Sequence, residues 1–441
     1  MNDMARGNAR DLATNPHLQE GVMSEGKQSG MTRRDFAKAS AAAAASLAVL
    51  SSGRAYAANN KLRAGLLGCG GRGTGAATQF MLGNDNVELV AMADLFPDRL
   101  EASRARIGEA KDDRVVNQFK VSDNMCFTGF DAYKKILDTD IDVLIEGTLP
   151  YSRPKHLTAA VEAGKHIFTE KPAAVDPAGI RQVIAAAEKA KEKNLCLVAG
   201  TQRRHQLNYQ ETIKKLHAGA IGDIKAMRVY WCGGLPFSHE RKPDWSELEY
   251  RIRNWYAYCW VCGDSIVEQH VHNLDIACWV LQANPVKVFA SGGRAWKTDD
   301  PIYGDMYDHF SCDYEFPNNV HVTSLCRHWG KADGGVFEEA FGTNGVSKCN
   351  DMMDSPPEKM VDPYIQEHTD LGNAIRGVDP YINEGVQVAH STMVAIMGRM
   401  SAYTGKALTW DEALNSELSI VPEEWDFSLP YPVDPVPRPG V

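Results

Sequence analysis

Gly68-Cys69-Gly70-Gly71-Arg72-Gly73 is the stretch of this sequence that decides the fold. It follows a short apolar run, Arg63-Ala64-Gly65-Leu66-Leu67, which predicts a buried strand, and it precedes a helix-compatible stretch from Thr74 to Leu82. A strand, a G-x-G-x-x-G turn and a helix in this order predict a unit that binds a dinucleotide. The glycine motif alone, without this context, would be a weak signal.

The three motif glycines have separate roles in such a turn. Gly68 permits the tight turn, Gly70 lets the backbone approach a pyrophosphate, and Gly73 lets the helix pack closely on the strand. The helix N-terminus then presents free N–H groups and the positive end of its dipole to the phosphates. Gly71 and Arg72 lie in the same turn, and we expect them to contact the nucleotide as well.

An acidic residue follows the next predicted strand, 21 residues after Gly73. This residue, Asp94, lies where a carboxylate would accept hydrogen bonds from the adenosine ribose. Its charge would repel a 2′-phosphate, and Leu95 follows it where an arginine could hold one. The sequence therefore favours NAD over NADP, although Arg72 and Arg99 are cations close by.

Strands and helices alternate through the first half of the chain, which predicts a doubly wound parallel sheet. The expected strands there are 87–93, 141–145, 166–168 and 195–199, and the expected helices are 100–110, 131–137, 156–163 and 176–192. Beyond about residue 200 the pattern favours a mixed or antiparallel sheet, because the last strands follow one another with a turn, 316–320, between them. The expected strands there are 224–230, 286–291, 309–316 and 320–326.

Three regions follow from these patterns. We expect residues 1–57 to be a disordered N-terminus and a signal peptide, residues 58–200 an NAD-binding Rossmann domain, and residues 201–441 an α+β domain, for which a family resemblance implies roles in substrate binding and oligomerisation. The last region ends in a proline-rich tail, after about Glu423, that we expect to lie extended on the surface. The predicted fold class is therefore α/β.

Composition excludes several classes of function. A net charge of -10 and a pI of about 5.7 lack the basic footprint of a nucleic-acid binder. Ten cysteines in 441 residues are too few for a disulfide scaffold. Cys259 and Cys262 form one C-x-x-C, but no second pair exists to complete a zinc site, so we predict no metal.

The N-terminal region has the residue pattern expected of an export signal. The basic stretch Thr32-Arg33-Arg34-Asp35-Phe36-Ala37-Lys38 precedes an alanine-rich apolar run, Ala39–Leu50, and then Ala55-Tyr56-Ala57 offers a cleavage site. This order predicts a twin-arginine signal, export to the periplasm, and a mature chain from about Ala58. The apolar run is too short to span a membrane, which takes about 20 residues. The alternative is a basic amphipathic segment that stays attached.

Further segments resemble the Gfo/Idh/MocA family, which includes glucose–fructose oxidoreductases and inositol dehydrogenases. The resemblance covers roughly residues 61–285 and continues more faintly to about 400. The segments that carry it are Asp142-Val143-Leu144-Ile145 leading to Thr148, Pro150 and His156, then Ala163-Gly164-Lys165-His166-Ile167-Phe168-Thr169-Glu170-Lys171-Pro172, Gly219-Ala220-Ile221-Gly222-Asp223-Ile224, and Gly263 to Asp275.

The resemblance implies a Rossmann domain followed by a domain with a large, open, mostly antiparallel sheet, whose face supports oligomerisation. It also implies that Lys171 lies beside the nicotinamide and the sugar. Glu268 and His272 would form an acid-x-x-x-His pair, with Asp275 one turn further along. The cofactor contacts that it implies outside the glycine turn are Thr148, His156, Glu170, Lys171 and Pro172.

Two positions depart from the family pattern. Position 268 is Glu where the family typically has Asp, so its carboxylate reaches one methylene further. Thr148-Leu149-Pro150-Tyr151 interrupts the usual Thr-Pro pair, which puts the cofactor contacts of that loop in doubt.

Oxidation of a secondary alcohol requires a base for the hydroxyl proton, and histidine titrates near neutral pH. Glu268 and His272 stand at i and i+4, so on one helix they share a face. His270 is the rival candidate, but it would point away from His272 on either a helix or a strand. We favour His272 because the family resemblance implies it and because it stands at i+4 from Glu268.

Other residues are candidate contacts for a sugar. Thr201-Gln202-Arg203-Arg204-His205 follows the end of a strand, where ligands bind in open α/β sheets, although a solvated basic turn explains it equally well. The aromatics of Tyr230-Trp231 and Arg253-Asn254-Trp255-Tyr256 could stack on sugar rings or belong to the core. The predicted substrate contacts are Arg204, His205, His270 and Asp275.

Three functions compete at this stage. The first is an NAD(H)-dependent oxidoreductase that acts on a sugar, polyol or sugar derivative, in which Lys171 and His272 transfer or position protons and Glu268 pairs with His272. The second is an NAD-dependent, redox-neutral glycoside hydrolase, which oxidises, eliminates, adds water and reduces. The third is a non-catalytic sugar sensor, against which the presence of both Lys171 and His272 argues.

Overall fold

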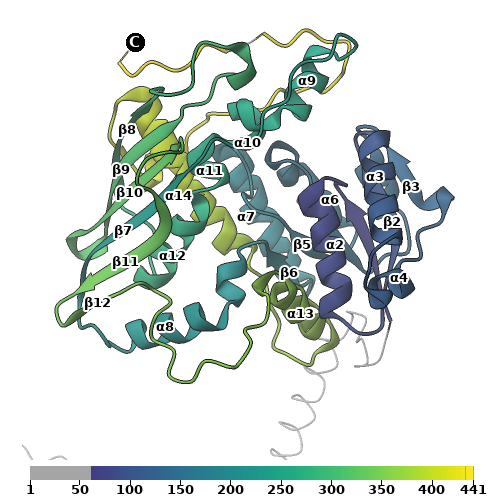
Figure 1. The fold of residues 1–441 in the computed structure, drawn as a ribbon, viewed down its shortest axis with the longest axis horizontal. Helices are drawn as coiled ribbons and strands as arrows, with labels where there is room; N and C mark the ends of the chain where they lie inside the picture. Colours follow the sequence, from purple (N-terminus) through teal and green to yellow (C-terminus); the bar gives the residue numbers. More distant parts are fainter. Residues whose placement is uncertain (1–60, 433, 441) are drawn as a thin grey trace, which may run out of the picture. The chain divides into compact units, whose positions relative to one another are not determined.

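The first sheet is parallel and six-stranded, as the sequence predicts. The structure, a computed structural model, describes residues 61–432 and 434–440. The strand order is β3-β2-β1-β4-β5-β6, which is that of a doubly wound sheet (Figure 1). The strands are β1 (Leu62–Leu67), β2 (Val87–Asp94), β3 (Cys126–Thr128), β4 (Val143–Glu146), β5 (His166–Thr169) and β6 (Leu197–Ala199).

Helices cover both faces of this sheet, so its central strands are almost continuously apolar and buried. A helix from late in the chain, α13 (Pro363–Arg376), packs against α2, where the Thr369 hydroxyl donates to the Gly83 carbonyl at 3.0 Å. The connecting helices are α2 (Gly71–Gly83), α3 (Pro97–Gly108), α4 (Asp113–Gln118), α5 (Ala132–Leu137), α6 (Arg153–Glu162) and α7 (Pro177–Glu192).

The second sheet is mixed and mostly antiparallel, which confirms the predicted fold class. It has seven strands in the order β12-β11-β7-β10-β9-β8-β13, and its one parallel pair is β7 with β10. The turn at 317–319 joins β9 to β10 as a hairpin, as predicted. The strands are β7 (Ile224–Gly233), β8 (Lys287–Gly293), β9 (His309–Phe316), β10 (Val320–His328), β11 (Gly335–Gly342), β12 (Gly345–Ser347) and β13 (Leu408–Thr409).

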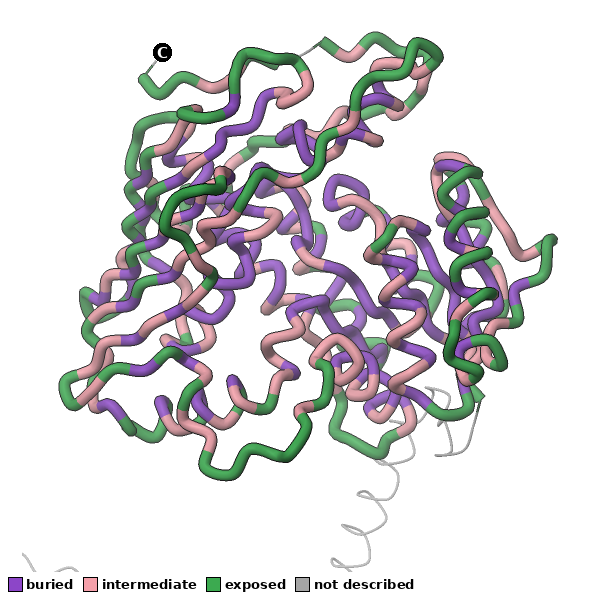
Figure 2. Tube along the Cα trace, in the orientation of Figure 1, coloured by how far each residue is buried: buried purple, intermediate pink, exposed green. Residues whose placement is uncertain are grey.

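Among the described residues, helices cover one face of the second sheet and leave the other face open. In β9 the alternate residues Phe310, Cys312 and Tyr314 are buried, whereas Ser311 and Asp313 are exposed (Figure 2). Helices α12 and α14 pack on the buried face, α12 against β7 and β11, and α14 against β8 and β9. Besides α13, the helices after β6 are α8 (Leu207–His217), α9 (Glu247–Arg253), α10 (Cys259–Cys262), α11 (Ser265–Glu268), α12 (Val271–Leu281), α14 (Gly385–Thr404) and α15 (Trp410–Leu414).

The structure describes the C-terminal end of the chain but not the N-terminal one. The predicted disordered stretch and twin-arginine signal, residues 1–57, lie outside the described residues. After α15 the described chain continues to residue 440 without another regular helix or strand. In the part of the chain that the structure describes, no helix combines the length and the apolarity needed to cross a membrane.

Candidate active site

The glycine turn joins β1 to α2 in a shape that two of its glycines require. Gly68 has φ +95°, and a Cβ there would lie 2.6 Å from the backbone of Gly147 and Thr148. A Cβ on Gly73 would collide with the Gly68 carbonyl oxygen. The turn after β1 is therefore packed directly against the turn after β4.

Gly70 and Gly71 face open space, in contrast to the packed glycines beside them. A Cβ at either position would meet no atom within 4 Å. Helix α2 begins at Gly71, and no side chain caps its first turn. Its first N–H groups can therefore hold a phosphate, and the absence of side chains lets a pyrophosphate approach them, so this turn fits a dinucleotide.

Asp94 lies at the carboxyl end of β2, beside the glycine turn. Its carboxylate accepts hydrogen bonds from the Cys69 N–H at 2.6 Å and from the Phe96 N–H at 2.8 Å. Burial raises the pKa of this carboxyl above its ordinary value, and the two N–H groups oppose that rise. Asp94 is therefore fixed in the wall of the site, at the position expected for a ribose contact.

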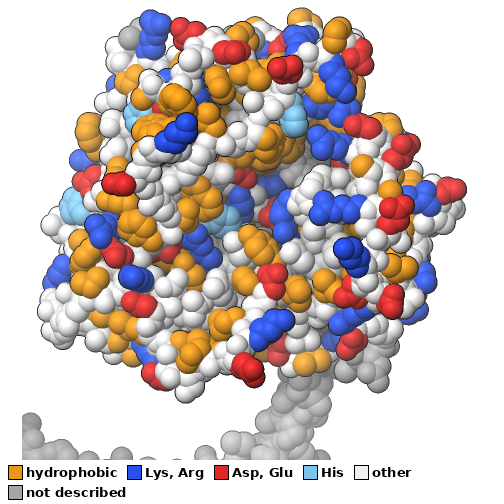
Figure 3. Space-filling model, in the orientation of Figure 1, with side chains coloured by type: hydrophobic (Ala, Val, Ile, Leu, Met, Phe, Trp, Pro, Cys, Tyr) orange, Lys and Arg blue, Asp and Glu red, His pale blue; other side chains and the backbone are white. Residues whose placement is uncertain are grey.

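A cavity of about 550 Å³ opens over this turn, in a size range typical of ligand pockets. Figure 3 shows hydrophobic and basic side chains interspersed over the face drawn there. The lining contains seven of the predicted cofactor residues, namely Gly68, Gly70, Gly71, Arg72, Asp94, Thr148 and His156. Within the described residues, the lining does not include Lys171, Glu268 or His272.

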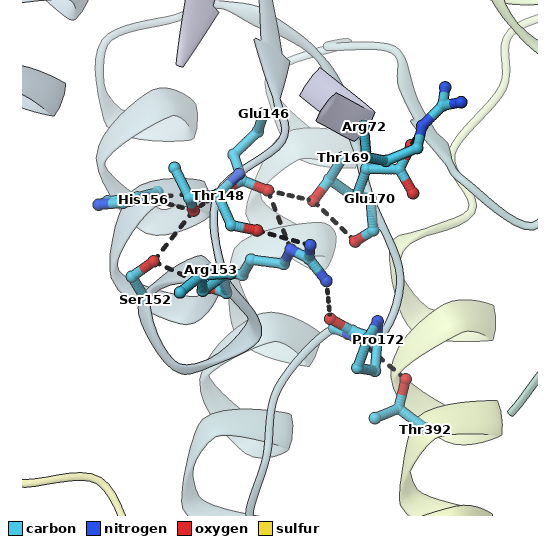
Figure 4. Close-up of polar contacts among 12 residues, drawn as sticks. Arg72, Glu146, Thr148, Ser152, Arg153, His156, Thr169, Glu170, Pro172 and Thr392 are labelled. Atoms are coloured by element: carbon cyan, nitrogen blue, oxygen red, sulfur yellow. Dashed lines mark hydrogen bonds and ion pairs between the residues drawn. The ribbon is translucent and has the colours of Figure 1, made fainter. Parts of the chain in front are cut away.

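A buried carboxylate organises the loop that follows β4 (Figure 4). Glu146, at the end of β4, accepts hydrogen bonds from the hydroxyl groups of Thr148 and Thr169. Burial would raise the pKa of Glu146, but His156, whose Nδ1 lies 3.6 Å from Glu146 Oε1, and the charge of Arg153 hold it below its ordinary value. His156 Nδ1 lies 3.1 Å from the Thr148 hydroxyl, so the interrupted Thr-Pro loop still joins these two residues.

Two arginines connect this loop and the glycine turn to the Glu170-Lys171-Pro172 segment that follows β5. Arg153 donates to the carbonyl oxygens of Thr148 and Pro172, both at 2.6 Å (Figure 4). Arg72, in the cavity wall, donates from Nε to Glu170 at 2.5 Å. Glu170 and Pro172 are thereby held on either side of Lys171.

Lys171 reaches from the Rossmann domain to the second domain. Its ammonium group donates to the Glu268 carbonyl oxygen at 2.5 Å and to Glu268 Oε1 at 2.8 Å. The Tyr256 hydroxyl donates to Glu268 Oε2 at 2.5 Å. Burial would raise the pKa of Glu268, but Lys171 and Tyr256 outweigh it and hold this pKa below its ordinary value. The site therefore holds Glu268 as a carboxylate between two donors.

The expectation that Glu268 and His272 share one continuous helix is wrong. Helix α11 ends at Glu268 and α12 begins at Val271. The His272 N–H bonds to the Gln269 carbonyl at 3.4 Å, whereas the Glu268 carbonyl accepts from Lys171. The break thus frees a backbone acceptor for the lysine.

The two candidate histidines lie in different surroundings. His272 is 8% exposed, and its ring stacks on Trp231 with centroids 5.9 Å apart. Burial lowers the pKa of His272 well below its ordinary value, and the charges of Lys171 and Arg203 add to that effect. His270 is fully buried, with Nε2 2.7 Å from the Ser324 hydroxyl, and burial lowers its pKa to about 3.

The remaining predicted substrate residues are engaged in internal ion pairs. Arg204 binds Asp275 through two hydrogen bonds of 2.9 Å. His205 Nδ1 lies 2.6 Å from Asp370, and His205 Nε2 lies 3.3 Å from Glu384. Despite burial, these two carboxylates raise the pKa of His205 to about 10. The structure therefore gives Arg204, His205 and Asp275 partners within the protein.

Sequence reasoning missed several residues at the site. Tyr256 and Trp255 stood in a segment noted for its aromatics, but nothing local indicated that Tyr256 contacts Glu268. Trp425 and Arg253 line the cavity, yet both are distant from the glycine turn in sequence.

The cysteines form no cluster with chemistry of its own. All ten are free, and Cys259 and Cys262 are buried in α10, where burial raises the pKa of both thiols. Within the described residues, no group of three or more His, Cys, Asp or Glu side chains is arranged to hold a metal ion.

The fold and the site define a class of protein, which comparison with protein families identifies. The model described as "Oxidoreductase family, NAD-binding Rossmann fold" matches residues 62–199, and the "GFO/IDH/MocA C-terminal domain" matches residues 209–347. The chain therefore belongs to the Gfo/Idh/MocA family of oxidoreductases, whose Rossmann domain binds NAD. This confirms the predicted family and cofactor.

Curated relatives include inositol dehydrogenases. The myo-inositol 2-dehydrogenase of Thermotoga maritima is 25% identical over 231 residues, which are 52% of this chain and 58% of that enzyme. The chain thus matches little more than half of that relative's length. The inositol 2-dehydrogenase of Salmonella typhimurium is 25% identical over 83% of this chain and 99% of its own length.

Solved structures share the fold at low identity. The aldose-aldose oxidoreductase of Caulobacter crescentus, complexed with glycerol, superposes with a TM-score of 0.62 at 17% identity, over 79% of this chain and 100% of that one. The scyllo-inositol dehydrogenase of Lactobacillus casei, with bound NAD(H) and scyllo-inositol, gives 0.61 at 17% identity, over 80% and 99%.

Proposed function

We propose that this chain is an NAD(H)-dependent oxidoreductase that acts on a secondary alcohol of a sugar, polyol or sugar derivative. The observation that carries the proposal is the contact between Lys171 and Glu268, which joins the two domains at the carboxyl edge of the parallel sheet. Ligands of open α/β sheets bind at that edge. The inositol dehydrogenase relatives support a polyhydroxylated substrate.

Bound NAD supplies a hydride acceptor, and the protein supplies proton transfer and positioning. Lys171 is held by Glu268, so its ammonium is directed and can donate a hydrogen bond to the oxygen that reacts. His272 has a depressed pKa, is neutral near pH 7 and can accept the hydroxyl proton. Tyr256 keeps the Glu268 carboxylate turned toward Lys171.

The test uses purified mature protein with NAD and a panel of inositols, aldoses and aryl glycosides. Reduction of NAD by a free polyol or sugar supports the proposal. Release of a phenol from an aryl glycoside without net NADH would contradict it and identify a redox-neutral glycoside hydrolase instead. NAD binding without either reaction would contradict it and leave a sugar sensor.

We also propose that the protein is exported by the twin-arginine route. The paired Arg33 and Arg34, the apolar run at 39–50 and the Ala55-Tyr56-Ala57 site support this. In a bacterial host with a twin-arginine system, the periplasmic fraction should contain a chain that begins near Ala58. Replacement of both arginines by lysine should retain the precursor in the cytoplasm, and an unchanged distribution would contradict export by this route.

We propose further that the uncovered face of the second sheet joins copies of this chain. Phe289 on β8 is 59% exposed, and Val346 on the edge strand β12 is 54% exposed. The family resemblance, in which this sheet face commonly supports oligomerisation, also supports the proposal. Light scattering should give the mass of a dimer or tetramer, and a monomer at micromolar concentration would contradict the proposal.

A further inference from the structure

Two segments outside the Rossmann sheet complete the walls of the cofactor cavity. We call residues 237–262, which follow β7 and contain α9 and α10, the arm. We call residues 420–431 the tail segment. In Figure 1 the yellow end of the chain passes beside α9. The arm and the tail segment contribute Phe237, His239, Ile252, Arg253, Trp255 and Trp425 to the lining.

The tail segment packs its aromatic rings against loops of the Rossmann domain. The Trp425 ring meets Tyr151 edge-on, with centroids 4.8 Å apart. Phe427 stacks on Phe96 at 5.9 Å and contacts Phe130 at 4.9 Å. These rings belong to a hydrophobic cluster separate from the cores of both sheets. The cavity wall is therefore backed by a small core of its own.

Hydrogen bonds hold the tail segment in place on both sides of Trp425. The Ile420 N–H donates to Asp176, the N-cap of α7, at 2.8 Å. Arg251 of α9 donates to the Tyr431 carbonyl at 2.5 Å. The tail segment thus bridges the Rossmann domain and the arm, and Trp425 is presented as a fixed wall.

The arm is fixed to the Rossmann domain by a bidentate ion pair. Arg253 donates two hydrogen bonds of 2.9 Å to Asp98, in the first turn of α3. Its guanidinium lies 3.9 Å from the centroid of the Phe96 ring. Asp98 lies four residues after Asp94, so the arm is attached beside the predicted ribose contact.

The position in the sheet identifies the half of the dinucleotide that meets these walls. Phe96 follows β2 and Phe130 follows β3, whereas Lys171 follows β5, on the other side of β1 and β4. A dinucleotide that spans the switch point between β1 and β4 has its adenosine over β2 and its nicotinamide toward β5. The arm and the tail segment therefore face the adenosine half.

We propose that the arm and the tail segment form the adenosine wall of the cofactor site, with Trp425 as the ring against which the adenine packs. This adenosine wall slows release of the dinucleotide, because the adenosine must separate from rings that are held in place by hydrogen bonds to Asp176, Arg251 and Asp98. This inference rests on the proposed use of NAD(H), and it assigns cofactor contacts to the C-terminal end of the chain.

Trp425→Ala tests the proposal in the full mature chain, with three probes titrated by calorimetry: NAD, ADP-ribose and nicotinamide mononucleotide. Base–aromatic stacking is worth about ten- to a hundredfold in affinity. Trp425→Ala should lower the affinity for NAD and for ADP-ribose by that factor and should leave the affinity for nicotinamide mononucleotide unchanged. It should also increase the rate at which NADH is released, measured by a stopped-flow chase, by a similar factor. The matched control is Leu429→Ala, in the same segment but exposed and outside the lining.

Several outcomes would overturn the proposal. Unchanged affinity of Trp425→Ala for ADP-ribose, an equal loss in Leu429→Ala, or an equal loss for nicotinamide mononucleotide would each do so. Thermal unfolding of the nucleotide-free variants separates a folding defect from a lost contact, and Trp425→Phe should restore most of the affinity. A wild-type protein that binds no NAD would contradict the proposed function itself, whereas normal NAD binding in Trp425→Ala would contradict the adenosine wall alone.

Discussion

The glycine turn and the Lys171 cluster are built in different ways. The turn offers backbone N–H groups, and its shape follows from a few glycines within one strand–helix unit. The Lys171 cluster is assembled from side chains of two domains, and Lys171 and Glu268 are 97 residues apart. Local sequence is enough to specify the glycine turn, whereas the Lys171 cluster forms only when residues far apart in the chain pack together.

The largest effect is expected in the side-chain cluster. His272→Ala should lower kcat by about 10²–10⁴-fold, the range for loss of a general base, while NAD affinity stays the same. Steady-state kinetics and calorimetry measure the two quantities. His270→Ala is the matched control: it should destabilise the fold by removing the Ser324 contact and spare kcat. If the two variants exchange these effects, His270 is the base.

Substitutions at two glycines of the turn should affect different quantities, one the stability of the fold and the other the affinity for NAD. Gly73→Ala forces a Cβ into the Gly68 carbonyl, so it should lower the free energy of unfolding by about 1–3 kcal/mol. Gly71→Ala meets no protein atom and should leave the stability of the nucleotide-free protein unchanged. Gly71→Ala should still lower the affinity for NAD at least about tenfold, because the added methyl group occupies space through which the pyrophosphate approaches the backbone. Equal NAD affinity in Gly71→Ala and wild type would contradict the phosphate assignment.

Asp94 combines a side chain with the backbone of the glycine turn, because its carboxylate accepts a hydrogen bond from the Cys69 N–H. Asp94→Ala removes a charged hydrogen-bond acceptor, a change worth about 1.5–3 kcal/mol, and should weaken NAD about ten- to a hundredfold. Removal of the charge should lower the affinity for NADP by a smaller factor, because the 2′-phosphate is no longer repelled. The ratio of the affinity for NAD to the affinity for NADP should therefore decrease. The ratio of the two dissociation constants measures this, and an unchanged ratio argues against a ribose contact.

The smallest effect concerns pH. His272 must be neutral to accept a proton, and burial lowers its pKa, so the neutral form persists below the ordinary value of about 6.5. At saturating substrate, kcat should therefore fall by less than about twofold between pH 8.0 and 6.5. An acid limb centred at or above pH 6.5 would show that His272 titrates normally or is not the base.

The sequence predicted the fold well because the deciding signals are local. The apolar strands, the glycine turn and the Phe316–Val320 hairpin depend on neighbouring residues, and all three lie where expected. The break between Glu268 and His272 was missed because no local signal marks it, and the Glu268 carbonyl that it frees accepts from Lys171, 97 residues away in the chain.

The residues that surround the site were predicted less well than the turn. Arg204 and Asp275 are polar residues at plausible positions, but each satisfies the other inside the protein. Tyr256 and Trp425 carried no distinguishing local pattern, because each gains its role from a contact made across the fold.

A crystal structure of the mature protein with NAD tests the arrangement most directly. The pyrophosphate should lie against Gly70 and Gly71, and the nicotinamide should lie beside Lys171 and His272. A nicotinamide directed away from Lys171, or a dinucleotide bound outside the cavity over the glycine turn, would contradict the site described above.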